Sequence, residues 1–287
     1  MIRVEHVSKQ YEKAERKALN DISFDLGDGE MLGLIGQNGA GKSTLLKILC
    51  KFIRADEGNV LVDGESILHR DNSLNRVGIL LEPVYFPYLS AWENLAFYLN
   101  VHGRPNELSE IDPMLELVDL QKNRDQKPTE FSFGMKQRLG LAQALLGKPR
   151  VLILDEPFVG LDPTGVKELI GILKKKVAED GMQAIISSHQ LYELNEVCER
   201  MLVLYNGELV FDGIPAFVPE ITLDLDHPYE GELGDRYPVT VENGGRRITV
   251  AESDPDQMLK EILAHYRIKN VVSRGSALER FFEEERS

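Results

Sequence analysis

The stretch that decides the fold lies between an apolar run, Met31–Ile35, and a helical pattern that begins at Lys42. Its residues, with Thr44 following, are Gly36, Gln37, Asn38, Gly39, Ala40, Gly41, Lys42 and Ser43. This order fits G-x-x-x-x-G-K-[ST], in which glycines let backbone N–H groups wrap phosphates at a helix N-terminus. We expect Lys42 to reach the β- and γ-phosphates of a nucleotide, and Ser43 to place a hydroxyl on Mg²⁺. The stretch therefore predicts an α/β fold with a P-loop NTPase core.

A second motif consists of the apolar run Val151–Leu154 followed by Asp155 and Glu156. A buried strand that ends in two carboxylates holds them rigidly at the edge of a sheet. Asp155 is expected to hold Mg²⁺, directly or through water, and Glu156 to act as general base on the attacking water. Many strands end in a solvated acid, so the motif gains its weight from the phosphate loop beside it.

Further motifs occur in a fixed order around these two. Phe131–Arg138 opens a helical pattern with Ser132 and Gly134, Gly160–Asp162 follows the acid pair, and His189 follows an apolar strand. Together with Tyr11 upstream, these elements resemble the signature, D-loop, switch histidine and adenine-stacking aromatic of ABC ATPases. The resemblance covers about the first 213 residues and is closest to single-domain ATPase subunits of ABC exporters.

The resemblance implies a role for each of these residues. Ser132 and Gly134 would face the ATP held by a second subunit, and Asp162 of the D-loop would also belong to the nucleotide-binding residues. His189 would sense the γ-phosphate, and Tyr11 would stack on adenine. The implied partners are an integral membrane permease and a second copy of the chain, or a paralogous ATPase subunit in its place.

Two segments depart from the family pattern. Phe131, Phe133 and Met135 stand where the usual signature has Leu, Gly and Gln. The glutamine of the family's Q-loop is replaced by Leu81, with Glu82 beside it. Glu82 takes over the Mg²⁺ or water contact by a slip of one residue, or it is a surface acid; the sequence leaves both interpretations open.

The chain is expected to divide into an ABC ATPase domain, 1–213, and a small α+β domain, 214–287. The first would contain an N-terminal antiparallel β region and a helical subdomain inserted at about 83–147. In the second, apolar alternation predicts strands at Ile221–Leu225, Tyr237–Val241, Ile248–Ala251 and Ile268–Val272. A helix is expected from Pro255 to about His265, and a last one at Ala277–Glu285.

Aromatic residues are dense between Pro83 and Tyr98. In proteins that this chain resembles, the region forms a groove for a cytoplasmic helix of the membrane partner, and exposed aromatic residues favour interfaces. The alternative is that they form the core of the helical subdomain. We expect Tyr85, Phe86 and Tyr88 to face the groove.

The composition bears on partners and location. A formal net charge of −14 repels the phosphates of nucleic acids and so disfavours binding to them. No direct nucleic-acid contact is therefore expected. No run approaches the ~18 apolar residues of a membrane span, which leads us to expect a cytoplasmic protein attached to the inner face of the membrane through its permease. Cys50 and Cys198 are expected to be buried, reduced thiols.

The resemblance favours an ATP-hydrolysing transporter subunit over two other classes of function. Within transport, the C-terminal extension and the unusual Q-loop segment favour export over import. A soluble ABC ATPase of DNA maintenance would carry a long coiled-coil insertion, and a translation-associated one would carry two cassettes; the chain has neither. A non-catalytic ATP-binding regulatory module would not need Lys42, Asp155, Glu156 and His189 together. The transported substrate is not predicted, because the membrane partner selects it.

Overall fold

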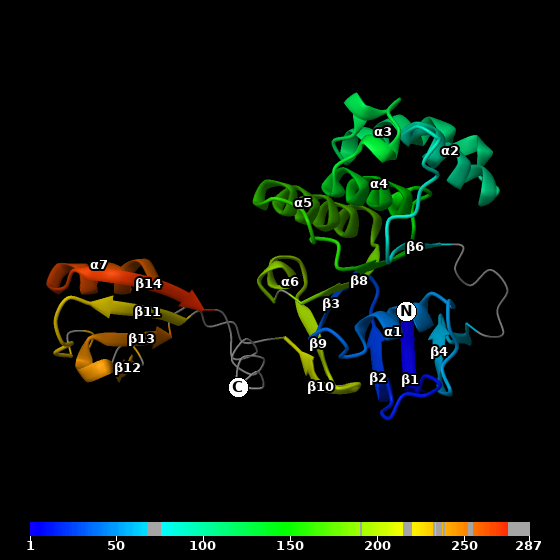
Figure 1. The fold of residues 1–287 in the computed structure, drawn as a ribbon. Coiled ribbons are helices and arrows are strands. Elements are labelled where there is room, and N and C mark those ends of the chain that lie inside the picture. The colour runs from blue at the N-terminus through cyan, green and yellow to red at the C-terminus, as the bar shows by residue number, and fades with distance from the viewer. Residues whose placement is uncertain are drawn as a thin grey trace. The chain divides into compact units, whose positions relative to one another are not determined.

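A computed structural model describes residues 1–67, 76–189, 191–214, 220–231, 233, 237, 239–251 and 255–274. The chain divides into two compact units, Met1–Gly213 and Ile214–Ser287 (Figure 1).

The first sheet of the N-terminal unit is antiparallel, with the strand order β2-β1-β4-β5. Its strands are β1 (Ile2–Lys9), β2 (Leu19–Leu26), β4 (Glu57–Val62) and β5 (Glu65–Ser66). Val4 of β1 lies opposite Phe24 of β2 and Val60 of β4, and all three side chains are buried. Apolar residues alternate with polar ones in β2 because one face of the sheet covers the core.

The second sheet has the order β10-β9-β3-β8-β7-β6. Its strands are β3 (Met31–Ile35), β6 (Val77–Leu80), β7 (Val151–Asp155), β8 (Gln183–Ser188), β9 (Arg200–Tyr205) and β10 (Glu208–Gly213). All neighbouring pairs are parallel except β9 and β10. The central strands are almost fully buried, which explains their continuous apolar runs. Their carboxyl ends share one edge, where ligands of such sheets bind.

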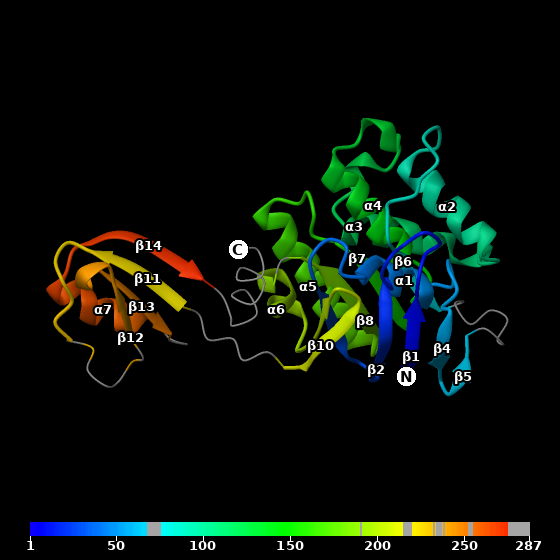
Figure 2. The same ribbon diagram turned by 60° about the horizontal axis from the view of Figure 1, so that its bottom comes forward.

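Helix α1 (Lys42–Leu49) belongs to the core shared by the two sheets. Leu45, Leu46 and Leu49 are buried in the same cluster as residues of β1, β2 and β3. Figure 2 shows α1 beside β1 and β2. Burial of these leucines fixes the helix, and with it the loop that ends where the helix begins.

A group of helices lies between β6 and β7 in the chain: α2 (Ala91–Val101), α3 (Ile111–Leu117) and α4 (Phe133–Leu145). Figure 1 shows these three helices together, on the β6 side of the unit. Helix α2 begins with a reciprocal capping box between Ser90 and Glu93. Two more helices follow β7 and β8: α5 (Pro163–Asp180) and α6 (Leu191–Val197).

The C-terminal unit has its own antiparallel sheet, β12-β13-β11-β14, and its described residues also form one α-helix. Its elements are β11 (Glu220–Leu225), β12 (Val239–Glu242), β13 (Arg247–Ala251), α7 (Pro255–His265) and β14 (Ile268–Arg274). Leu223, Ile248, Met258 and Ile262 form the centre of its core. The helix expected at Ala277–Glu285 lies outside the described residues.

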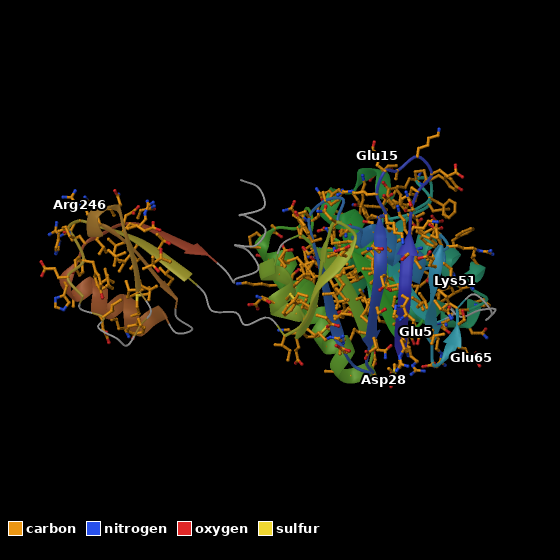
Figure 3. All side chains as sticks on the ribbon, turned by 90° about the horizontal axis from the view of Figure 1, so that it is seen from below. Glu5, Glu15, Asp28, Lys51, Glu65 and Arg246 are labelled. Atoms are coloured by element: carbon orange, nitrogen blue, oxygen red, sulfur yellow. The ribbon has the colours of Figure 1, made fainter. Side chains whose placement is uncertain are left out.

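Charged side chains lie at the periphery of both units. Figure 3 shows Glu15 at one end of the β1–β2 pair and Asp28 at the other, and Arg246 at the edge of the C-terminal unit. Within the described parts of the chain, no helix combines the length and the apolar character that a membrane crossing requires.

Candidate functional site

The phosphate loop connects the carboxyl end of β3 to α1, and two of its glycines are required by space. A side-chain carbon on Gly36 would lie 2.5 Å from the carbonyl oxygen of Leu204, and one on Gly41 would lie 2.5 Å from that of Ala18. Gly41 also has a φ of 111°, which side chains disfavour. The loop is therefore held tightly against β9 and the β1–β2 connection, with its backbone free to approach a ligand.

Lys42 is buried at the start of α1. Its Nζ donates a hydrogen bond to the carbonyl oxygen of Gly36 over 2.6 Å, and it lies 3.5 Å from Oε1 of Glu156. The ammonium group of Lys42 therefore contacts both the first residue of the phosphate loop and the carboxylate that follows β7.

Ser43 and Asp155 bring oxygen atoms together at the sheet edge. The hydroxyl of Ser43 donates to Asp155 Oδ2 over 2.8 Å, and the hydroxyl of Ser187 donates to the other carboxylate oxygen. Oxygen donors of this kind are the ligands that Mg²⁺ prefers, so the pair fits such an ion. No motif in the sequence points to Ser187; the two serines at the end of a buried strand were the available signal.

Glu156 is held through its backbone and through both carboxylate oxygens. Its backbone N–H donates to Ser187 Oγ over 3.0 Å, and its φ of 48° is an uncommon, strained value for a residue with a side chain. His189 Nδ1 lies 2.8 Å from Oε2, whereas Lys42 Nζ lies near the other carboxylate oxygen, Oε1. The structure therefore brings Lys42, Glu156 and His189, predicted from three separate motifs, into one cluster.

Two acidic groups beside the site, Cys50 and Glu193, have raised pKa values. Burial, with a smaller effect of the Asp155 charge, raises the pKa of the Cys50 thiol to about 12. Burial also raises the pKa of Glu193, and the charge of Glu156 adds to this shift. Burial has this effect because it disfavours the charged form of an acid.

Tyr11 and Glu82 lie on the rim of this cluster. The hydroxyl of Tyr11 is 3.3 Å from Thr44 Oγ1, and the ring is 43% exposed, which leaves it open for stacking. Glu82 is exposed and lines, together with Ser43 and Asp155, a cleft of about 620 Å³. Its position is compatible with the metal-contact interpretation.

Ser132, Gly134 and Asp162 lie at the starts of two other helices. Ser132 caps α4 by accepting a hydrogen bond from the N–H of Met135, and Asp162 caps α5 through the N–H of Gly165. A side-chain carbon on Gly134 would lie 3.3 Å from Leu161. The signature segment thus contacts the D-loop of its own chain.

Comparisons with known proteins agree with this geometry. The sequence profile of the family described as ABC transporter matches residues 19–159. The lantibiotic transport ATP-binding protein SrtF of Streptococcus pyogenes is 38% identical over 214 residues, which cover 74% of this chain and 90% of SrtF. The chain belongs to the ABC transporter ATP-binding proteins. The fold class expected from the sequence is confirmed.

Other members of the ABC family are similar over a smaller share of their length. The uncharacterized ABC transporter ATP-binding protein YdbJ of Bacillus subtilis is 36% identical over 68% of this chain. The chain spans only 58 to 64% of the length of YdbJ and two further relatives. Among solved structures, a dimeric ATP-binding cassette in a post-hydrolysis state, bound to ADP and Pi, matches with a TM-score of 0.68 and 25% identity over 75% of this chain and 98% of that one.

Proposed function

We propose that this chain hydrolyses ATP to drive a separate membrane permease. The observation that carries the proposal is the position of Glu156, held between Lys42 and His189 beside the Ser43–Asp155 pair. A carboxylate fixed next to a phosphate-binding cation and a hydrogen-bonding imidazole has the surroundings that a general base for phosphoryl transfer to water requires.

In this proposal the backbone of the phosphate loop and Lys42 bind the phosphates of ATP, and the ring of Tyr11 stacks on adenine. Ser43 and Asp155 would hold Mg²⁺, with Glu82 as a further candidate ligand from the same cleft. When bound, the ion would neutralise charge on the phosphate oxygens. Electrostatic stabilisation of this kind supplies most of the catalysis in phosphoryl transfer.

Glu156 would accept a proton from the attacking water as the bond to the γ-phosphorus forms and the bond to the β–γ bridging oxygen breaks. His189 contacts Oε2 of the carboxylate through Nδ1. In its protonated form, in which both ring nitrogens carry hydrogen, it would also donate a hydrogen bond to the γ-phosphate from Nε2. The products are ADP and phosphate. Loss of the γ-phosphate removes the group by which His189 would distinguish the ATP-bound from the ADP-bound protein.

A second copy would complete the site, with its Ser132 and Gly134 contacting the γ-phosphate. Support comes from the exposed start of α4 and from the dimeric state of the cassette that this chain resembles. The chain carries both halves of such a composite site, so a homodimer is sufficient, and a paralogous subunit can replace one copy. ATP would hold the dimer together by binding both surfaces.

The permease would dock on the aromatic segment that follows Glu82. Phe86 stacks edge-on against Phe97 and contacts Tyr88, and these three side chains are 36, 44 and 64% exposed. A cluster of exposed rings favours an interface. This docking would place the protein on the inner face of the membrane. Export is proposed over import because of the C-terminal unit and the missing Q-loop glutamine.

The first test replaces Glu156 by Gln, which keeps the shape of the side chain but removes the base. We expect the rate of ATP hydrolysis to fall by at least ~100-fold, the usual contribution of a general base. Glu116→Gln, an exposed carboxylate on α3, is the matched control and should hydrolyse at the wild-type rate. Wild-type turnover by Glu156→Gln would show that the base is misassigned.

The permease is tested by purifying tagged, ATP-loaded Glu156→Gln protein from detergent-solubilised membranes of its native cell. A polytopic membrane protein in stoichiometric amount is expected. A soluble dimer without such a partner would contradict the coupling to transport while leaving the ATP chemistry intact.

A further inference from the structure

Phe133 is a large apolar side chain at a position where the signature pattern has glycine. It is the first residue of α4 and is 55% exposed. Its ring lies directly on Gly160: a side-chain carbon added to Gly160 would lie 2.6 Å from Cε1 of Phe133, 3.3 Å from Cγ, and closest to Cδ1. Only a residue without a side chain leaves room for this contact.

The next residue of each segment makes a parallel contact. Gly134 approaches Leu161, with 3.3 Å between Leu161 Cδ2 and the position of an added side-chain carbon. Residues 133 and 134 therefore meet residues 160 and 161 in the same order. The start of α4 and the loop behind it form a two-residue contact surface.

The loop that Phe133 covers begins at the proposed catalytic base. One end is fixed by the contacts of Glu156 with Lys42, Ser187 and His189, and the other by Asp162 as the cap of α5. Between them, Phe158 anchors the loop in the core, whereas Gly160 has a φ of 76° and faces Phe133. The ring is thus the external support of the half of the loop that the core does not hold.

We propose that Phe133 is a positioning residue that fixes the loop between Glu156 and Asp162 to the start of α4. The inference rests on the proposed function, in which the start of α4 meets the ATP of a second copy. When α4 contacts that ATP and shifts, it moves Gly160. The three residues between Gly160 and Glu156 transmit this movement, which changes the orientation of the Glu156 carboxylate. Because the ring is mostly exposed, its removal should change the free energy of unfolding little. Its role is to couple the position of α4 to the loop that leads to Glu156.

The test measures steady-state ATP hydrolysis of Phe133→Ala, Phe133→Leu and, as a control, Val210→Ala, an exposed apolar residue on β10. We expect kcat of Phe133→Ala to fall about tenfold, since small misplacements of catalytic groups have effects of at least this size. ADP affinity and the unfolding midpoint should stay at wild-type values. Leu should restore more than half of kcat, and Val210→Ala should match wild type.

A double-mutant cycle tests the contact itself. Gly160→Ala should lower kcat by pushing the ring away, and in Phe133→Ala the same change should have a much smaller additional effect, because the obstructing ring is gone. Multiplicative effects of the two substitutions would overturn the proposal, as would a kcat of Phe133→Ala within twofold of wild type.

Amide hydrogen exchange of the loop gives a readout that does not depend on turnover. Exchange at residues 158–161 should be faster in Phe133→Ala and unchanged in Val210→Ala. Unchanged exchange in Phe133→Ala would overturn the positioning role even if Glu156→Gln proves the proposed function right. A wild-type protein no faster than Glu156→Gln would instead contradict the proposed function and the inference together.

Discussion

The phosphate loop and the signature segment both lead into the start of a helix, but they are constrained in different ways. In the phosphate loop, Gly36 and Gly41 meet backbone carbonyl groups at distances that admit no side chain. In the signature segment, Ser132 caps α4, while Phe133 stands at a position that glycine usually occupies. A loop that wraps a ligand with its own backbone preserves its sequence pattern. A helix start that faces outward needs a cap and leaves room for a large side chain beside it.

The largest difference between the two segments is expected when one glycine in each is replaced by alanine, and the larger loss should occur in the phosphate loop. Gly41→Ala combines a left-handed φ with contacts of 2.5 Å to Ala18 O and 2.8 Å to Leu19 Cδ2. We expect it to lower the free energy of unfolding by about 3 kcal/mol and to abolish nucleotide binding, since strain and overpacking add. Urea unfolding and binding of a fluorescent ATP analogue measure both.

Gly134→Ala is the matched control within the signature. Its added methyl group would meet the side chain of Leu161 at 3.3 Å and the carbonyl oxygen of Gly160 at an ordinary 3.5 Å, and alanine is a better helix former than glycine. Its unfolding free energy should stay within about 1 kcal/mol of wild type, and the monomer should bind ADP normally. Equal losses for the two variants would show that the two segments are constrained alike.

The fold was largely predictable because its elements carry local signals. The apolar runs of β3, β7 and β8 and the glycines before Lys42 predict a buried parallel sheet with a phosphate loop at one edge. The alternation in β11 and β13 and the turn at Asn243–Gly245 likewise predict the C-terminal sheet. These signals depend on neighbours in sequence, so one chain is enough to read them.

The contacts that link the motifs were not predictable. Ser187 bonds to Asp155, 32 residues away, and Phe133 covers Gly160 across 27 residues. Neither pairing has a periodic signature, because it depends on which strands and helices become neighbours. The same holds for the aromatic segment, where sequence alone does not tell that Trp92 is half-buried while Tyr88 is exposed.

A smaller effect is expected from removing the cap of α4. Ser132→Ala should lower the unfolding free energy by about 1 kcal/mol, the usual value of an N-cap. Ser90→Ala on α2 should cost at least as much, because Ser90 is buried and its capping box with Glu93 is reciprocal. Only Ser132→Ala should also reduce ATP hydrolysis, which separates loss of the cap from loss of the contact with a second copy.

The smallest effect concerns one cation–aromatic pair in each region. Lys136 Nζ of α4 lies 5.9 Å from the centre of the Tyr85 ring, and Lys9 Nζ lies 6.0 Å from that of Tyr11. The ammonium of Lys9 also binds Asp56 over 2.7 Å, so its charge is partly compensated. We expect a coupling free energy of about 0.5 kcal/mol for Lys136 and Tyr85, and less for Lys9 and Tyr11.

Double-mutant cycles with Lys136→Met and Tyr85→Leu, and with Lys9→Met and Tyr11→Leu, measure both couplings by urea unfolding. Added ATP should change only the second cycle, because in the proposed function the ring of Tyr11 would stack on adenine, whereas Tyr85 lies in the aromatic segment. A change in the Lys136–Tyr85 coupling on adding ATP would mean that nucleotide binding already reaches the start of α4 within one chain. The phosphate loop and the signature segment would then differ in their sequence constraints but would be energetically coupled.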